Sequence, residues 1–274
     1  MSVGGLRGRV ALVSGVSRRQ GIGFAIASRL VARGADLFLT HHRPHDEDQP
    51  WGGDDLEALV EELREKRDVP SQRIVDMAVD LAEDEAPEAV MERAVAEFGH
   101  VDVLICNHAR SGGDGAIGDL TAEMLDGHWA VNARSALLLV QSFAAQHDGR
   151  PGGRVVLMTS GQGLGPMPGE VAYAASKAAL AGVTVTLADQ LAVAGITVNT
   201  VNPGPVDTGY MTPEIMARVA PMFPIGRMGE PDDPARLIEW LVSDEGRWMT
   251  GQVLNTEGGF ARWRSPADDR PPEA

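Results

Sequence analysis

Short apolar runs alternate with longer segments of helical periodicity along most of the chain. The apolar runs predict strands at residues 9–14, 36–40, 73–79, 101–107, 153–160, 197–202 and 252–256. The segments between them predict helices at residues 21–33, 54–67, 87–98, 121–146, 170–194 and 231–243. Alternation of this kind is typical of an α/β protein with one parallel sheet, right-handed crossovers and helices on both faces. The sequence therefore predicts a doubly wound parallel sheet.

Three segments depart from this alternation. Residues 41–54 are polar and turn-rich, which predicts a loop, and residues 264–274 have the composition of a disordered tail. Residues 204–229 are rich in proline, glycine and methionine. No change of composition splits the chain, so we expect one domain over residues 1–263 that includes the segment 204–229.

The overall charge narrows the range of partners. The 274 residues carry a formal net charge of −15, so a nucleic acid would be repelled. Hydrophobic residues make up 43% of the chain, which is enough for the core of one large domain. The N-terminal apolar run is too short for a signal peptide, and no apolar stretch reaches the length of a membrane span. These features predict a cytoplasmic protein without nucleic-acid or membrane partners.

The single cysteine agrees with a reducing compartment. Cys106 lies inside the apolar run at 101–107, and one thiol cannot form an intrachain disulfide. No basic residue precedes it in the strand, so nothing there would activate a nucleophile. We therefore expect a buried, structural thiol.

A glycine-rich turn follows the first predicted strand. It reads SGVSRRQGIG from Ser14 to Gly23. In an open parallel sheet, ligands lie beyond the carboxyl ends of the strands, and glycines let the backbone approach a phosphate at a helix N-terminus. The spacing matches neither G-x-G-x-x-G nor a P-loop. The turn alone is therefore a weak indication of a phosphate-containing ligand.

Four polar residues farther along the chain could carry out acid–base chemistry. Tyr173 and Lys177 are four residues apart on one helix face, Ser160 ends the preceding strand, and Asn132 interrupts an apolar helix. A ketone that accepts a hydride becomes an alkoxide, which a tyrosine phenol can protonate. The reference pKa of a phenol, ~10, is high for the reverse step, and the charge of Lys177 would favour the phenolate.

Taken in order, these motifs resemble those of the short-chain dehydrogenase/reductase family from about residue 6 to residue 260. The glycine-rich turn resembles the family's TGxxxGIG, lengthened by two residues and with serine in place of threonine. NHAR resembles NNAG and keeps the first asparagine, while NTVNPGPVDT, IGRMGEPDDPA and TEGGF resemble later motifs. The family's catalytic residues are matched by Asn132, Ser160, Tyr173 and Lys177. The resemblance implies a Rossmann-type fold and an NAD(P)(H)-dependent enzyme, with 3-oxoacyl reductases the most similar members.

The same resemblance implies a role for each matching residue. Tyr173 is the general acid/base, Ser160 hydrogen-bonds the substrate oxygen, Lys177 holds the nicotinamide ribose, and Asn132 anchors a water that relays protons. Asp80 stands where the family has an acid that touches the adenine. The dinucleotide contacts implied are Gly15, Ser17, Arg18, Arg19, Gly21, Ile22, Gly23, His41, His42, Asp80, Leu81, Asn107, Ala109, Tyr173, Lys177, Pro203, Gly204, Val206 and Thr208.

The end of the second predicted strand favours NADP(H) over NAD(H). NAD-preferring relatives have an acid there that binds both ribose hydroxyls, whereas this chain has His41 and His42. Arg18 and Arg19 flank the glycine-rich turn, and a guanidinium suits a 2′-phosphate. The alternative is that both arginines are solvated at the tip of the loop. The histidines and acids of 41–48 lack the spacing of a metal site, and we expect no metal.

The sequence does not identify the substrate or the oligomeric state. Residues 204–229 correspond to the family's mobile substrate lid, whose methionines suit an apolar substrate, and residues 109–119 would form the opposite wall. Relatives act on 3-oxoacyl thioesters, sugars, steroids or alcohols, and are usually homodimers or homotetramers. An acidic acyl carrier protein would need a local basic patch on this acidic chain.

Two other functions are compatible with the same fold. The first is a non-catalytic dinucleotide-binding regulator, which would not need the intact Ser160, Tyr173 and Lys177. The second is an enoyl-thioester reductase. That branch has six residues between its tyrosine and lysine, whereas this chain has three.

Overall fold

Seven strands form one parallel sheet in the computed structural model, which describes residues 5–49 and 52–261. The strands are β1 (Val10–Ser14), β2 (Asp36–His41), β3 (Ile74–Ala78), β4 (Val103–Cys106), β5 (Gly153–Met158), β6 (Ile196–Asn202) and β7 (Val253–Asn255). Their order is β3-β2-β1-β4-β5-β6-β7, and every neighbouring pair is parallel. The predicted single-domain, Rossmann-type doubly wound sheet is therefore confirmed.

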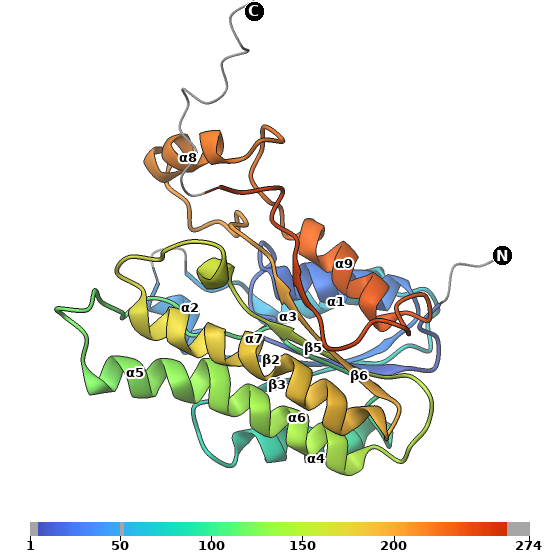
Figure 1. The fold of residues 1–274 in the computed structure, drawn as a ribbon. Helices are drawn as coiled ribbons and strands as arrows, with labels where there is room; N and C mark the ends of the chain where they lie inside the picture. The colour runs from blue at the N-terminus through green and yellow to red at the C-terminus, as the bar shows by residue number, and fades with distance from the viewer. Residues whose placement is uncertain (1–4, 50–51, 262–274) are drawn as a thin grey trace, which may run out of the picture.

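Helices cover both faces of this sheet (Figure 1). The connecting helices are α1 (Ile22–Ala32), α3 (Leu56–Glu65), α4 (Ala86–Phe98), α5 (Ala122–His128), α6 (Ser135–Gln146), α7 (Val171–Ala192) and α9 (Asp232–Val242). One buried cluster joins α1, α3 and α9 to the sheet, and a second joins α4, α6 and α7 to the opposite face. The core therefore lies in two layers, one on each side of the strands.

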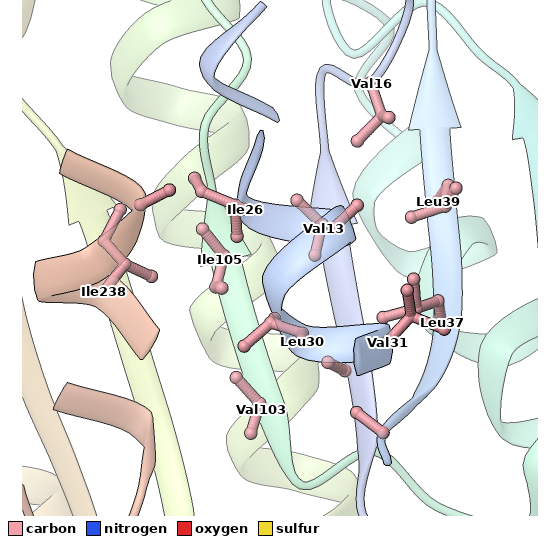
Figure 2. Close-up of a cluster of buried hydrophobic side chains, with 14 of the residues drawn as sticks. Val13, Val16, Ile26, Leu30, Val31, Leu37, Leu39, Val103, Ile105 and Ile238 are labelled. Atoms are coloured by element: carbon pink, nitrogen blue, oxygen red, sulfur yellow. The ribbon is translucent and has the colours of Figure 1, made fainter. Parts of the chain in front are cut away.

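Side chains of α1 fix this helix directly over the central strands. Ile26, Leu30 and Val31 project from α1 among the residues of β1, β2 and β4, with Ile238 of α9 beside them (Figure 2). Each of these four side chains is fully buried, which stabilises the fold by about 1.5–3 kcal/mol per side chain. The turn between β1 and α1 is therefore held between two rigidly packed elements.

The structure corrects two local predictions and adds a helix within a third segment. Residues 41–54 are not a plain loop, because α2 (Arg43–Glu47) forms within them with Pro44 in its first turn, where a proline removes no helical hydrogen bond. The segment 204–229 contains α8 (Pro213–Val219), whose N-terminus Thr212 caps. The helix predicted at 121–146 is interrupted by a π-helical turn, η1 (Trp129–Arg134), between α5 and α6. The predicted tail at 264–274 lies outside the described residues.

Helix α7 also departs from the expectation that no segment could span a membrane. An 18-residue window of this 22-residue helix has a mean hydropathy of 1.4, which suffices by length and composition alone. The helix nevertheless packs against β6 and η1, and Figure 1 shows it lying across the face of the sheet. Its apolar character is that of a core helix in this fold.

Candidate functional site

The residues expected in the site gather at the carboxyl edge of the sheet. They follow β1, β2, β3, β4, β5 and β6, and the carboxyl ends of parallel strands lie along one edge. Strands β2 and β3 are added on one side of β1, and β4 to β7 are added on the other side. The loops that leave β1 and β4 therefore diverge, and ligands usually bind in the crevice at this point of such sheets. The glycine-rich turn and Asn107 lie at that crevice.

Two glycines of the turn are required by backbone contacts. Gly15 has a φ of +73°, and a Cβ there would lie 2.8 Å from the Cα of His108. A Cβ on Gly23 would lie 2.3 Å from the carbonyl oxygen of Gly15. Asn107 holds the same turn, because its Nδ2 donates to the carbonyl oxygens of Ser14 (3.1 Å) and Gly15 (3.0 Å). The turn therefore brings bare backbone to the start of α1.

This turn fits a pyrophosphate. Helix α1 begins after Gly21, and no described side chain caps its N-terminus there. The first amide groups of a helix point toward its N-terminal end with a partial positive charge, and they suit an anion. Ser17 and Ile22 lie in the same turn and are partly exposed. The donors and the close backbone approach thus match what a dinucleotide needs.

The two arginines of the glycine-rich turn have different partners. The Arg18 guanidinium donates to the carbonyl oxygen of Thr208, so it bridges the turn and the segment after β6. The Arg19 amide donates to Asp54 at 2.6 Å, and its guanidinium pairs with Glu62 at 3.1 Å. Both arginines line a cavity of about 400 Å³ together with Gln20, Gly52, Asp54 and Gly209. Arg19 is therefore not simply solvated at a loop tip.

Histidines occupy the end of β2, as the sequence indicates. His41 is 8% exposed, and its Nε2 lies 3.2 Å from Asp76 on β3. Among the described residues, its buried Nδ1 has no hydrogen-bond partner. His42 Nε2 lies 3.8 Å from the Asp80 carboxylate, and Leu81 is buried behind it. An unpartnered ring nitrogen at this edge is compatible with a polar ligand group.

The segment after β6 completes this side of the crevice. Gly204 has a φ of +68°, and a Cβ there would lie 2.4 Å from the Cβ of Glu257. Its amide donates to the Asn202 Oδ1 at 2.9 Å, which turns the chain sharply after Pro203. Val206 is buried and pairs with Gly229 in an isolated bridge. Ala109 follows β4, and Val206 and Thr208 follow β6, so all three lie on segments that leave the same edge of the sheet.

Ser160, Tyr173 and Lys177 come together as expected. Ser160 follows β5, and its hydroxyl is near enough to the phenol of Tyr173 to influence the pKa of that phenol. Lys177 Nζ lies 5.8 Å from the centroid of the Tyr173 ring. The ammonium also donates to the carbonyl oxygen of Met158 at 2.9 Å, and the Lys177 side chain is only 2% exposed. The three groups form one compact cluster, in which Lys177 is buried and Ser160 and Tyr173 are partly exposed.

Burial dominates the titration of this cluster. It raises the pKa of Tyr173 to about 12, although the hydrogen bond with Ser160 lowers it in part. Burial also lowers the pKa of Lys177 to about 8. The net direction for Tyr173 is therefore opposite to the expectation that Lys177 would favour the phenolate. In this state of the protein, the phenol therefore carries its proton at neutral pH.

Asn132 is buried in the π-helical turn and joins three elements. Its Oδ1 accepts from the Arg110 amide at 2.7 Å, and its Nδ2 donates to Ser176 Oγ of α7 at 3.0 Å. The Nδ2 also lies 3.4 Å from Nδ1 of His128. The amide thus connects η1, the loop after β4 and α7. π-Helical turns are frequent at functional sites.

Cys106 is buried, as predicted, and burial raises the pKa of its thiol to about 12. It therefore remains protonated and unreactive. His41 and His42 pair separately with Asp76 and Asp80. Within residues 5–49 and 52–261, no three histidine, cysteine or acidic side chains gather as a metal site requires.

Three polar residues that the sequence analysis did not single out also lie here. His108 is hydrogen-bonded to Ser14 Oγ through its Nδ1 at 2.6 Å, and burial lowers its pKa to about 3, so it is neutral. Asp114 accepts amide hydrogens from the first turn of α7, and His128 is fully buried beside it. His128 could have been noticed four residues before Asn132, on the same helix face. Nothing in the sequence around Asp114 indicates that its side chain caps a distant helix.

The chain is similar to known proteins over nearly its whole length. A family profile described as Enoyl-(Acyl carrier protein) reductase matches residues 15–261. "Uncharacterized oxidoreductase YjdA" of Bacillus subtilis is 42% identical over 256 residues, which cover 93% of this chain and 97% of the relative.

Solved structures agree with these sequence matches. A short-chain dehydrogenase/reductase from Serratia marcescens is 31% identical with a TM-score of 0.79, covering 93% of this chain and 98% of that one. A blue fluorescent protein from a metagenomic library, solved in complex with NADPH, is 33% identical with a TM-score of 0.81, covering 93% and 99%. With its parallel sheet and its cluster of serine, tyrosine and lysine, this chain belongs to the short-chain dehydrogenase/reductase family of oxidoreductases.

Proposed function

We propose that the protein is an NADP(H)-dependent oxidoreductase that interconverts a ketone and a secondary alcohol, with Tyr173 as the general acid/base. One observation carries the proposal: the Tyr173 phenol lies beside the Ser160 hydroxyl, with the Lys177 ammonium 5.8 Å from the centroid of its ring. The cluster lies at the same sheet edge as the glycine-rich turn. A dinucleotide regulator would not need these three groups together.

Each member of the cluster has a distinct task at the substrate oxygen. The Tyr173 hydroxyl donates a proton as the ketone becomes an alkoxide, and it accepts one in the reverse direction. The Ser160 hydroxyl donates a hydrogen bond to the same oxygen and orients the carbonyl. Because burial keeps the phenol protonated, the unliganded site already carries the proton that reduction of a ketone requires.

Lys177 and Asn132 support these two residues. Lys177 is anchored by the Met158 carbonyl, and its two remaining N–H donors suit the hydroxyls of a ribose. Its positive charge also stabilises the phenolate that remains when Tyr173 gives up its proton. The Asn132 side chain is engaged with Arg110, Ser176 and His128, so its main contribution is to hold the loop after β4 against α7.

We further propose a place along a bound dinucleotide for each of the remaining residues. Gly15, Gly21, Ile22 and Gly23 would face the pyrophosphate, His41, His42, Asp80 and Leu81 the adenosine half, and Asn107, Ala109, Pro203, Gly204, Val206 and Thr208 the nicotinamide half. When bound, the nicotinamide supplies or accepts the hydride. Ser17, Arg18 and Arg19 would lie against the phosphates.

NADP(H) is the proposed dinucleotide for two reasons. No carboxylate ends β2, where His41 and His42 stand instead. Arg18 and Arg19 line the 400 Å³ cavity beside the glycine-rich turn, and a guanidinium binds phosphate through two parallel hydrogen bonds. The NADPH complex of the similar metagenomic protein is consistent with this choice.

The substrate is a small carbonyl compound or alcohol with an apolar part. Phe223 of the segment 204–229 is buried, with its ring centroid 4.9 Å from that of Phe260, so it supports the lid rather than lining an open pocket. A 3-oxoacyl thioester is one candidate. Enoyl-thioester reduction is the second candidate function, favoured by the description of the matching family profile, although Tyr173 and Lys177 are only four residues apart on α7.

A homodimer or homotetramer is part of the proposal, within a cytoplasmic setting. Apolar side chains are exposed on η1, on α7 and directly after α7: Trp129 is 48% exposed, Val185 66% and Val193 95%. A second copy could cover this surface through a two-fold axis. Residues 5–261 would act as one catalytic domain that includes the lid at 204–229.

A substrate screen with both dinucleotides tests the proposal. The purified protein is expected to oxidise NADPH with at least one ketone, with a kcat/KM for NADPH at least about tenfold above that for NADH, because each charge-assisted hydrogen bond is worth about 1.5–3 kcal/mol. Absorbance of the reduced nicotinamide measures both. A preference for NADH would overturn the assignment of NADP(H). Turnover of enoyl thioesters alone would favour the second candidate, and tight binding without turnover would indicate a regulator.

The pH profile provides a separate prediction. Tyr173, with its pKa of about 12, is protonated across the usual range, so alcohol oxidation should accelerate by up to about tenfold per pH unit as the phenolate fraction grows. Ketone reduction should instead decline as the pH rises through about 8, where Lys177 loses its charge. Initial rates in both directions from about pH 6 to 10 measure this. A flat oxidation profile would contradict Tyr173 as the base.

A further inference from the structure

The first turn of α7, which carries Tyr173, is capped from a distant loop. The Asp114 Oδ1 accepts from the amide of Ala172 at 3.0 Å, and its Oδ2 accepts from the amide of Tyr173 itself at 2.7 Å. The Val171 amide donates to the carbonyl oxygen of Gly115 at 3.4 Å. Glu170, which directly precedes the helix, makes no capping bond with its side chain. Three successive amides of α7 are therefore satisfied by residues that follow β4.

Asp114 is a buried and well-fixed carboxylate. Its side chain is only 5% exposed, and its Oδ1 also accepts from the Gly115 amide at 2.7 Å. Burial disfavours the charged form, but the three amide donors lower the pKa of Asp114 overall. The carboxylate therefore stays ionised and complements the positive end of the helix.

His128 and Asn132 fix the loop that carries Asp114. His128 is fully buried, and its Nε2 donates to the carbonyl oxygen of Gly112 at 3.1 Å. Its ring meets the ring of Tyr173 edge-on at 6.0 Å. Asn132 binds the Arg110 backbone at the start of the same loop. The loop would otherwise be free to move, because it contains glycine at positions 112, 113, 115 and 118.

We propose that Asp114 is a positioning residue for catalysis: by binding the amide of Tyr173, it sets the place of the phenol relative to Ser160 and the substrate oxygen. This inference rests on the proposed function. The Tyr173 ring extends from the same residue whose backbone Asp114 holds, so a shift of the first turn displaces the phenol directly. Displacements of about 1 Å between reacting groups can lower a rate by about a hundredfold.

Two variants of Asp114 test the inference. Asp114→Ala removes both acceptor oxygens and should lower kcat by about ten- to a hundredfold, while the KM for the ketone and the Kd for NADPH stay within about twofold. Asp114→Asn keeps one acceptor oxygen and should show an intermediate loss, roughly three- to tenfold. Hydrogen–deuterium exchange of the peptide containing residues 171–176 should be faster in both variants than in the unsubstituted protein.

A cap on another helix supplies the matched control. Asp55 caps α3 by accepting from the Ala58 amide at 3.2 Å, so Asp55→Ala removes a similar bond away from Tyr173. Its kcat should equal that of the unsubstituted protein. An Asp114→Ala or Asp114→Asn kcat within twofold of the unsubstituted protein would overturn the inference, as would an equal loss in Asp55→Ala. If Asp114→Ala does not fold, the kcat of Asp114→Asn alone tests the inference. An unsubstituted protein without turnover would overturn the proposed function, and the inference with it.

Discussion

Replacing Tyr173 with phenylalanine should lower ketone reduction by about 10²- to 10⁴-fold, the usual contribution of a positioned general acid. The substitution removes one hydroxyl and keeps the ring that packs against His128. Ser160 and Lys177 remain, but neither replaces the proton that the phenol delivers to the substrate oxygen. The Kd for NADPH should change by no more than a few-fold, because the glycine-rich turn and Lys177 are unaltered. Steady-state kinetics and fluorescence titration measure the two quantities.

The second tyrosine provides the matched control for this substitution. The chain has two tyrosines, and Tyr210 is 40% exposed at the start of the lid. Tyr210→Phe removes the same atom and should cost at most a few-fold in kcat. Rates near those of the unsubstituted protein in Tyr173→Phe would show that the proton comes from another group, and the assignment of Tyr173 would then be wrong.

The Gly23→Ala substitution should damage both the fold and the dinucleotide site. The added Cβ would lie 2.3 Å from the Gly15 carbonyl oxygen and 2.7 Å from Asn107 Nδ2. Both neighbours are held in place, so the turn must open. Forced contacts of this kind cost about 1–3 kcal/mol, which corresponds to a fall in Tm of roughly 2–4 °C per kcal/mol for a chain of about this size. The Kd for NADPH should rise at least about tenfold, because the turn no longer presents its backbone to the pyrophosphate.

Gly118 offers the comparison for this second substitution. It lies in the loop after β4, and a Cβ there would have nothing within 4 Å. Gly118→Ala should leave the Tm within about 1 °C of the unsubstituted protein. A Gly23→Ala protein with unchanged Tm and unchanged Kd would contradict the tight packing of the turn.

The sequence predicted the features that depend on local pattern. The central strands β1, β4 and β5 are continuous buried runs, so their positions and their parallel arrangement follow from hydrophobicity and from the helices between them. Tyr173 and Lys177 share a helix face because of their spacing. Ser160 meets them because a strand ends where the next helix begins. The placement of all three is a consequence of chain order.

Features that depend on contacts across the chain were not predictable in this way. Asp114 reaches α7 across 58 residues of sequence, and nothing in the glycine-rich segment around it indicates a helix cap. The π-helical turn needs one extra residue to be accommodated within α5 and α6, which helical periodicity does not reveal. The pKa of Tyr173 depended on how deeply the ring is buried, whereas the sequence indicated only that a positive charge was near.

The deep burial of Lys177 also couples proton binding to folding. Its pKa is about 8 in the folded chain and 10.5 for a lysine in water, so the unfolded chain holds more protons between these two values. The free energy of unfolding therefore increases with pH across this interval. Near neutrality the native state bears the cost of a desolvated ammonium, and alkaline conditions relieve it. The buried Lys177 ammonium, which supports proton transfer at Tyr173, therefore lowers the free energy of unfolding near neutral pH.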